Sequence, residues 1–380
     1  MVLLLVTFMA LLSLFMSSGG TRESTSFRTV LWPAPGRRDD EDFSFSRIPF
    51  KTKEAITLGT WRYGRQPISR PVAPIPREVL AARPPHVFHF CVIFSRPQEF
   101  GLLRDGLGAA FDLISELHYI TWEWYSGESH MTSAECLAAD YIWSRDGFYG
   151  PIDKWVRKTL GHVRHKIAMQ ETSITMPNRE ALLWYHAVFY ETEWFRNRPQ
   201  YKALLDLHPR MYQAFGVNTA IFRPREPTGM GTPQSKLFDY MYAGQIDDVL
   251  KRVLRITEKS GRRLVVGNTG RQSTVDALRA AGVEVIAEQA AYEDLAALMR
   301  MSKIVFVPTA DWGGGERLLL EARACGTAVE YAEDNGKLKH LMELPVPNHC
   351  LFAQQLLRGF ANATGNVVLG IESISDRCDV

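Results

Sequence analysis

The feature that most constrains this chain is a glycine triplet, Gly313, Gly314 and Gly315, which joins a mostly apolar run to an amphipathic one. The apolar run at residues 303–307 predicts a β-strand, and the residues after the triplet predict a helix that ends at Gly326. Glycines allow a sharp turn after the strand and leave bare N–H groups at the positive end of the helix. This arrangement suits a diphosphate, and an ordinary tight turn is the alternative.

The helix after the triplet carries an acidic residue at the border of its apolar face. That face consists of Leu318, Leu319, Ala322 and Cys325. On a helical wheel Glu321 lies about 60° from Leu318, so its carboxylate can reach a cleft and accept hydrogen bonds from two hydroxyls, such as those of a ribose. The alternative is an i,i+4 ion pair with Arg317, and the residues alone do not decide between them.

Residues 319–327, LLEARACGT, resemble the signature helix of the retaining group-1 glycosyltransferases, the family typified by glycogen and sucrose synthases. The resemblance implies the GT-B architecture: an α/β fold of two Rossmann-like, doubly wound domains that face each other across a cleft. It also implies a transferase that moves a sugar from a nucleoside diphosphate donor to a hydroxyl acceptor with retention, without a metal or other cofactor. The expected partners are the donor and a glycan, lipid or protein acceptor.

The chain departs from that family at two places. The family has a second Glu eight positions before the helical one, where this chain has Gly313, so that Asp311 or Glu316 takes its place or the role is absent. The family also has Arg after the glycine that ends the first strand of the donor domain, and Gln245 follows Gly244 here.

Cations remain near the expected diphosphate. Lys251 lies close to the position of the family's lysine, although the more ordinary role for it and for Arg252 is that of cations on a helix surface. Arg271 is a further phosphate candidate. The resemblance therefore implies the following site, without a metal: catalytic Glu316, Asp311 and Lys251, and donor-binding Gly313, Gly314, Gly315, Glu321, Gly244 and Arg271.

Composition is that of a globular chain. With 380 residues, of which 46% are hydrophobic and 23% charged, the chain is long enough for two α/β domains. A net charge of +2 gives no field that would attract nucleic acid. The five cysteines are odd in number and lack CxxC spacing, which argues against a zinc site or a disulfide framework and leaves at most a pair of Cys350 with Cys378.

The amino terminus predicts entry into the secretory pathway. Residues 1–20 contain an apolar run that reads as a cleavable signal peptide or a short signal-anchor, so membrane attachment is open. Residues 21–85 are rich in Pro, Arg, Ser and acidic residues and read as a stem. In a lumenal protein the sequon at Asn362 is open to glycosylation.

The remaining chain predicts two domains and a tail. Residues 86–222 form the expected acceptor domain, residues 223–347 the nucleotide-sugar domain and residues 348–380 a C-terminal helix and tail. The expected strands are 87–94, 119–124, 141–143, 166–170, 187–190, 236–244, 264–266, 283–287 and 303–307. The expected helices are 100–117, 133–139, 151–160, 179–184, 200–205, 247–259, 273–281, 292–302 and 351–360, the last of which crosses back onto the first domain.

Polar residues of the acceptor domain add only weak candidates. Gln170, Glu171 and residues 191–193 follow strands, where side chains face a cleft, although a solvated loop is the more ordinary role. His89 lies inside an apolar strand and reads as a core residue. The competing functions are a nucleotide-sugar-binding protein that has lost turnover and a nucleotide-sugar epimerase.

Overall fold

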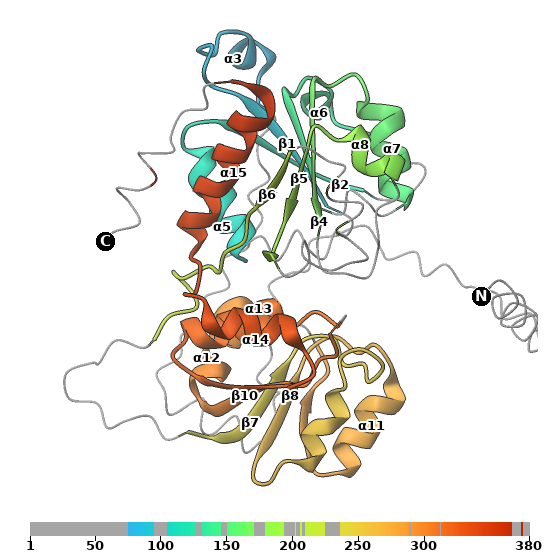
Figure 1. Cartoon of the computed structure of the whole chain (residues 1–380), viewed down its shortest axis with the longest axis vertical. Helices are drawn as coiled ribbons and strands as arrows, with labels where there is room; N and C mark the ends of the chain where they lie inside the picture. Colours follow the sequence, from blue (N-terminus) through green and yellow to red (C-terminus); the bar gives the residue numbers. More distant parts are fainter. Residues whose placement is uncertain are drawn as a thin grey trace, which may run out of the picture. The chain divides into compact units, whose positions relative to one another are not determined.

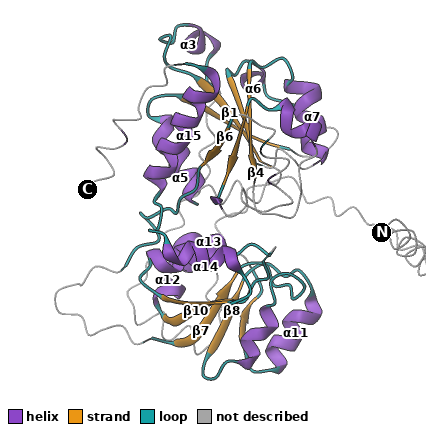
Figure 2. Ribbon diagram, viewed as in Figure 1, coloured by secondary structure: helices purple, strands orange, loops and turns teal. Residues whose placement is uncertain are grey.

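The structure is a computed structural model that describes residues 75–94, 105–125, 131–145, 150–170, 179–193, 202, 206, 210–224, 236–288, 290–311, 313–366 and 374 (Figure 1). The described elements form two separate parallel β-sheets with helices packed against them (Figure 2). This confirms the α/β prediction. The predicted signal segment lies outside the described residues, as does the predicted stem up to residue 74. From residue 75 the stem contains one short helix, α3 (Arg77–Ala81), with no buried residue. None of the described helices has the length and apolar character needed to cross a membrane.

The first sheet has the strand order β2-β1-β3-β4-β5-β6, and every pair is parallel. Its strands are β1 (His89–Phe94), β2 (Tyr119–Trp124), β3 (Tyr141–Ser144), β4 (His165–Gln170), β5 (Ala187–Tyr190) and β6 (Met211–Gln213). The intervening helices are α5 (Gly106–Ser115), α6 (Ala134–Leu137), α7 (Gly150–Leu160) and α8 (Arg179–Trp184). Five of these strands were predicted, whereas β6 was missed because three partly buried residues carry almost no pattern.

Side chains of β1 alternate between two hydrophobic cores. Phe90 and Val92 face the core that contains α5, and Cys91 and Ile93 face the core that contains α7. The first core is completed by α15 (His349–Thr364), which follows the second sheet in the sequence but packs beside α5 (Figure 1). The prediction that the last helical segment returns to the first domain is therefore confirmed.

A disulfide joins Cys91 in β1 to Cys136 in α6, across a sequence separation of 45 residues and a Cα–Cα distance of 5.1 Å. The inference against disulfides from an odd cysteine count was therefore wrong. The pairing depends on how α6 packs on the sheet, which cysteine spacing does not reveal. Cys350 is also disulfide-bonded, while its predicted partner Cys378 lies outside the described residues, and Cys325 is a buried free thiol.

The second sheet has the parallel order β11-β10-β7-β8-β9. Its strands are β7 (Phe238–Ala243), β8 (Arg263–Val266), β9 (Glu284–Ile286), β10 (Ser302–Val307) and β11 (Ala328–Tyr331). Its helices are α11 (Gln272–Ala280), α12 (Tyr292–Arg300), α13 (Glu316–Ala324) and α14 (Gly336–Glu343). Neither β11 nor α14 was predicted, and β11 carries no fully buried residue that would have marked it as a strand.

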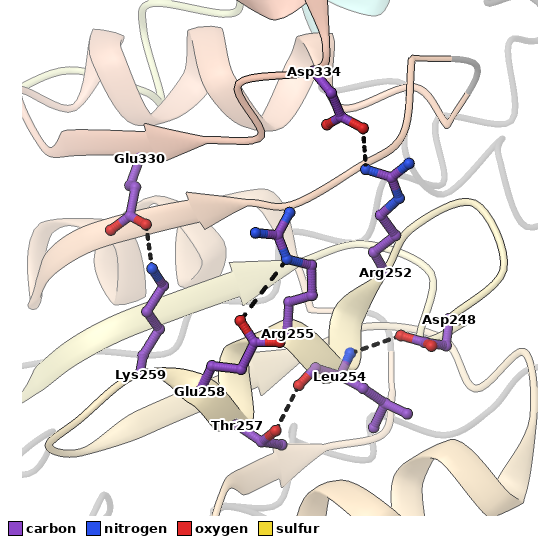
Figure 3. Close-up of polar contacts among 9 residues, drawn as sticks. All are labelled: Asp248, Arg252, Leu254, Arg255, Thr257, Glu258, Lys259, Glu330 and Asp334. Carbon is purple, nitrogen blue, oxygen red and sulfur yellow. Dashed lines mark hydrogen bonds and ion pairs between the residues drawn. The ribbon is translucent and has the colours of Figure 1, made fainter.

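The helix predicted for residues 247–259 is wrong. Only η2 (Val253–Glu258) is helical, and it is a 3-10 helix. Two acidic side chains at the start of the segment bind backbone N–H groups: Asp247 accepts from Val249 at 3.2 Å, and Asp248 accepts from Leu254 at 2.9 Å (Figure 3). These local hydrogen bonds compete with the helical pattern, because Asp offers the backbone an alternative acceptor. The segment before η2 is therefore a turn.

Candidate functional site

The glycine triplet lies where the sequence predicted, between β10 and α13, and its last two members adopt backbone angles that favour glycine. Gly314 has φ 80° and Gly315, the N-cap of α13, has φ 99°. The Gly314 carbonyl accepts a hydrogen bond from the Thr309 hydroxyl at 3.0 Å. A Cβ on Gly315 would lie 2.6 Å from that same hydroxyl oxygen, so the turn requires glycine for space as well as for its backbone angles.

Gly313 packs directly on the turn that precedes η2. A Cβ at this position would collide with the carbonyl oxygen of Leu250, which already accepts a hydrogen bond from the Ala310 N–H at 2.8 Å. The glutamate that the resembled family carries here therefore does not fit this backbone. The packing of the loop therefore requires glycine at position 313, where the resembled family has glutamate.

Lys251 is drawn into the loop rather than exposed on a helix. Its Nζ donates a hydrogen bond to the Gly313 carbonyl oxygen. Burial lowers the pKa of Lys251, with Glu316 acting against the shift and Lys337 adding to it. The interpretation of Lys251 as a helix-surface cation is therefore wrong.

Arg252, the residue after Lys251, has a strained backbone conformation. Arg252 has φ 49° and is the one non-glycine among the described residues with a positive φ. Its guanidinium pairs with Asp334 at 2.6 Å, which ties the turn to the start of α14 (Figure 3). Left-handed backbone at a residue other than glycine costs on the order of 1–3 kcal/mol and is found preferentially at functional sites.

Glu316, the first residue of α13, is 2% exposed and pairs with Lys337 of α14, which is 0% exposed. Asn335 positions this second helix, because it accepts from the Leu338 N–H at 3.2 Å and donates to the carbonyl oxygens of Thr309 and Ala310. Lys337 was not among the predicted site residues. A lysine near the start of a helix is usually a surface residue, and no local sequence pattern indicates that this one is buried.

Glu321 is buried, with 6% of its surface exposed. Within the part of the chain that the structure describes, its carboxylate has no hydrogen-bond or ion-pair partner, because Arg317 pairs with Asp105 instead. The i,i+4 pair with Arg317 is therefore wrong. Burial raises the pKa of Glu321 well above its ordinary value of 4.5, and the Asp105 carboxylate raises it further. A buried carboxylate without a partner is costly unless a ligand completes it.

Three predicted site residues remain: Gly244, Asp311 and Arg271. Gly244 ends β7 with φ 137°, and its carbonyl leaves no room for a Cβ on Gly267, so the ends of β7 and β8 touch there. Asp311 belongs to the loop itself. Arg271 is exposed at the N-cap of α11. The fold thus gathers Lys251, Glu316 and the glycines.

The first sheet offers buried polar groups at its carboxyl end. Glu191 and Thr192 follow β5 and are buried, so their interpretation as a solvated loop is wrong, while Glu171 lies outside the described residues. His89 is a buried core residue, as predicted, with its Nε2 2.7 Å from the Thr121 hydroxyl. Burial is the main reason that the pKa of His89 falls to about 4. Among the described residues, no group of three or more His, Cys, Asp or Glu side chains could hold a metal ion.

No protein-family model matches this chain, and no curated protein sequence matches it. Among solved structures it is similar to the sucrose-phosphate synthase of Thermosynechococcus elongatus, at 13% identity and a TM-score of 0.45, over 76% of this chain and 94% of that one. It is also similar to Anabaena Alr3699/HepE in complex with UDP-glucose, at 12% identity and a TM-score of 0.47, over 77% of this chain and 99% of that one. A third similar structure is the trehalose-6-phosphate synthase OtsA, at 13% identity and a TM-score of 0.45, over 77% of this chain and 94% of that one.

Proposed function

We propose that this chain is a glycosyltransferase that moves a sugar from a nucleoside diphosphate donor to a hydroxyl acceptor. The observation that carries the proposal is the buried, unpartnered carboxylate of Glu321 on the helix that begins at the glycine loop. The nucleotide ribose supplies two adjacent hydroxyl donors, which would complete that carboxylate. The LLEARACGT resemblance supports the same assignment from the sequence.

The diphosphate would lie against the glycine loop. The N-terminus of α13 carries partial positive charge, and Lys251 adds a full one beside Gly313 and Gly314. Charge of this kind stabilises a departing diphosphate more than the intact donor, since the leaving group gains negative charge as its bond breaks. Asp311, Gly244 and Arg271 stay as candidates around the same donor.

Transfer requires no base stronger than the leaving group. The bond between the anomeric carbon and the diphosphate oxygen breaks, and its electron pair leaves with the diphosphate. The acceptor oxygen forms the new bond to that carbon, and its proton passes to the departing diphosphate. If both events use one face of the sugar, the configuration is retained, in keeping with the resembled family. The charges named above belong to the protein, so the proposal includes no metal or cofactor.

A nucleotide-sugar-binding protein without turnover is the second candidate. Two observations favour it: Gly313 has no room for the glutamate of the resembled family, and Gln245 stands where that family has arginine. Both candidates share the donor site and differ only in whether transfer follows.

The disulfide supports the proposed compartment. Bonds such as Cys91–Cys136 persist in oxidising environments, in agreement with the signal segment predicted for residues 1–20. We therefore propose that the protein acts in the lumen of the secretory pathway, where glycans, lipids and proteins all offer acceptor hydroxyls.

The test is a transfer assay over UDP-, GDP- and ADP-sugars with mixed hydroxyl acceptors, run in EDTA and again with Mg²⁺. Transfer in EDTA, lost in Glu321→Ala, supports the enzyme. Donor binding without transfer in either condition supports the binding protein. A wild-type chain that binds no nucleotide sugar rules out both.

A further inference from the structure

Glu316 lies between two lysines beside the glycine loop. Its Oε1 pairs with the Nζ of Lys337. Its Oε2 lies 3.6 Å from the position of a Cβ on Gly314, and the Nζ of Lys251 lies 3.0 Å from that same position. The cluster therefore holds two cations and one carboxylate around the glycine loop.

The neighbouring polar groups are engaged elsewhere. The Asn335 amide donates to two backbone carbonyls, and Arg252 pairs with Asp334. Asp247 attracts Lys251 more weakly than Glu316 does, and its own Oδ1 accepts from the Val249 N–H. Glu316 is thus the charged group that acts most strongly on Lys251.

Because Glu316 is buried, the loss of its partner would be costly. Lys337 and Glu316 are both almost fully enclosed, and a charge held there without a partner costs far more than one at the surface. Were Lys337 absent, Lys251 would be the nearest cation to Glu316 and would become its partner.

We propose that Glu316 balances charge rather than taking part in catalysis, and that Lys337 holds it away from Lys251 so that the Lys251 ammonium remains available to the donor's diphosphate. This inference rests on the proposed donor site. Lys337 is a positioning residue, because it acts through Glu316.

The inference predicts that the affinity of each variant for pyrophosphate follows the net charge of the cluster. Relative to wild type, Glu316→Gln adds one positive charge, Lys337→Met removes one, and the double variant leaves the total unchanged. Inorganic pyrophosphate, titrated calorimetrically at low salt, is the probe. We expect Glu316→Gln to bind it about tenfold more tightly, since one charge at a few ångströms near a surface is worth at least that much. The double variant should bind as wild type does.

Lys337→Met alone leaves Glu316 buried beside a single lysine and is expected to bind pyrophosphate at least tenfold more weakly, if it folds. The decision therefore depends on Glu316→Gln and the double variant, with folding checked by thermal unfolding. The matched control is the partly exposed Lys259–Glu330 pair, which joins the residue after η2 to β11 (Figure 3). Glu330→Gln should leave pyrophosphate affinity unchanged.

A catalytic or purely structural Glu316 gives the opposite result: a folded Glu316→Gln protein that binds pyrophosphate equally or more weakly overturns the inference, as does the absence of pyrophosphate binding in every variant. The outcome is separate from the transfer assay. Tighter pyrophosphate binding by Glu316→Gln without transfer from any nucleotide sugar keeps the charge assignment and removes the transferase.

Discussion

Arg317 pairs with Asp105 at 3.3 Å, 212 positions away in the sequence, rather than with Glu321 one helical turn along α13. Asp105 is the N-cap of α5 and also pairs with Arg145 at 3.4 Å. The two arginines satisfy Asp105 and leave Glu321 buried beside it without a cation. The availability of Glu321 to a ligand is therefore a consequence of where Arg317 points.

Replacing Glu321 should weaken donor binding without unfolding the protein. Charge-assisted hydrogen bonds to two ribose hydroxyls are worth roughly 1.5–3 kcal/mol, so Glu321→Ala should bind UDP or GDP about ten- to a hundredfold more weakly. Calorimetric titration measures this. The control is Glu258→Ala, which removes an exposed glutamate paired with Arg255 at 4.0 Å (Figure 3). Equal nucleotide affinity in both variants would contradict the ribose role.

The pH dependence of stability should identify the same carboxyl. Because the folded-state pKa of Glu321 is raised above 4.5, the folded protein binds more protons than the unfolded chain between these two values. The free energy of unfolding therefore falls as pH rises through that window. Glu321→Gln removes this dependence, so its stability relative to wild type should increase as the pH rises above 4.5. Urea unfolding across that pH range is the measurement, and a pH-independent difference would contradict it.

Gly314→Val should abolish donor binding while the domain stays folded. A side chain there meets the Lys251 ammonium and requires left-handed backbone, at a cost on the order of 1–3 kcal/mol. Gly282→Val is the matched control, because Gly282 has φ 75° in the same sheet unit with its nearest neighbouring atom at 3.8 Å. Both variants should lose similar stability by thermal unfolding, but only Gly314→Val should lose UDP and GDP binding. Unchanged nucleotide affinity in folded Gly314→Val would remove the diphosphate from this loop.

Removing the Cys91–Cys136 disulfide should destabilise the first sheet. A cross-link across 45 residues restricts the unfolded chain, and such bonds are typically worth about 2–4 kcal/mol. In urea unfolding, the double variant Cys91→Ala/Cys136→Ala should have a free energy of unfolding that is lower by that amount. The folded protein should retain nucleotide binding. Cys325→Ala, which removes a buried free thiol, is the control and should cost less. A double variant as stable as wild type would show that this bond does not form.

Asn362 should carry a glycan if the chain enters the secretory pathway. The residue is exposed on α15 within the sequon Asn362-Ala363-Thr364. Expression in a secretory host should give a mass that falls after deglycosylation, and Asn362→Gln should remove that difference. This change leaves intact the hydrogen bond from Thr364 to the Phe360 carbonyl at 2.8 Å, so folding serves as the control. A secreted wild-type protein of unmodified mass would contradict the prediction.

The elements with strong local patterns were predictable. Buried strands such as β1 and β10, the helix α13 and the glycine turn between them follow from apolar periodicity and from backbone angles that glycine favours, both of which are properties of adjacent residues. The helix at residues 247–259 was the exception, because capping by Asp247 and Asp248 overrode its periodicity.

By itself, the sequence determined the alternation of strands and helices, the glycine turn and the position of Glu321 on the helix that follows it. Only the tertiary structure decided which charges meet: that Arg317 binds Asp105, that Lys251 enters the loop, that Lys337 is buried against Glu316 and that Cys91 lies beside Cys136. The physical reason is range. Hydrogen-bonded turns and helical faces depend on neighbours within a few positions, whereas each of these pairings depends on segments that approach one another only when the sheets and helices pack.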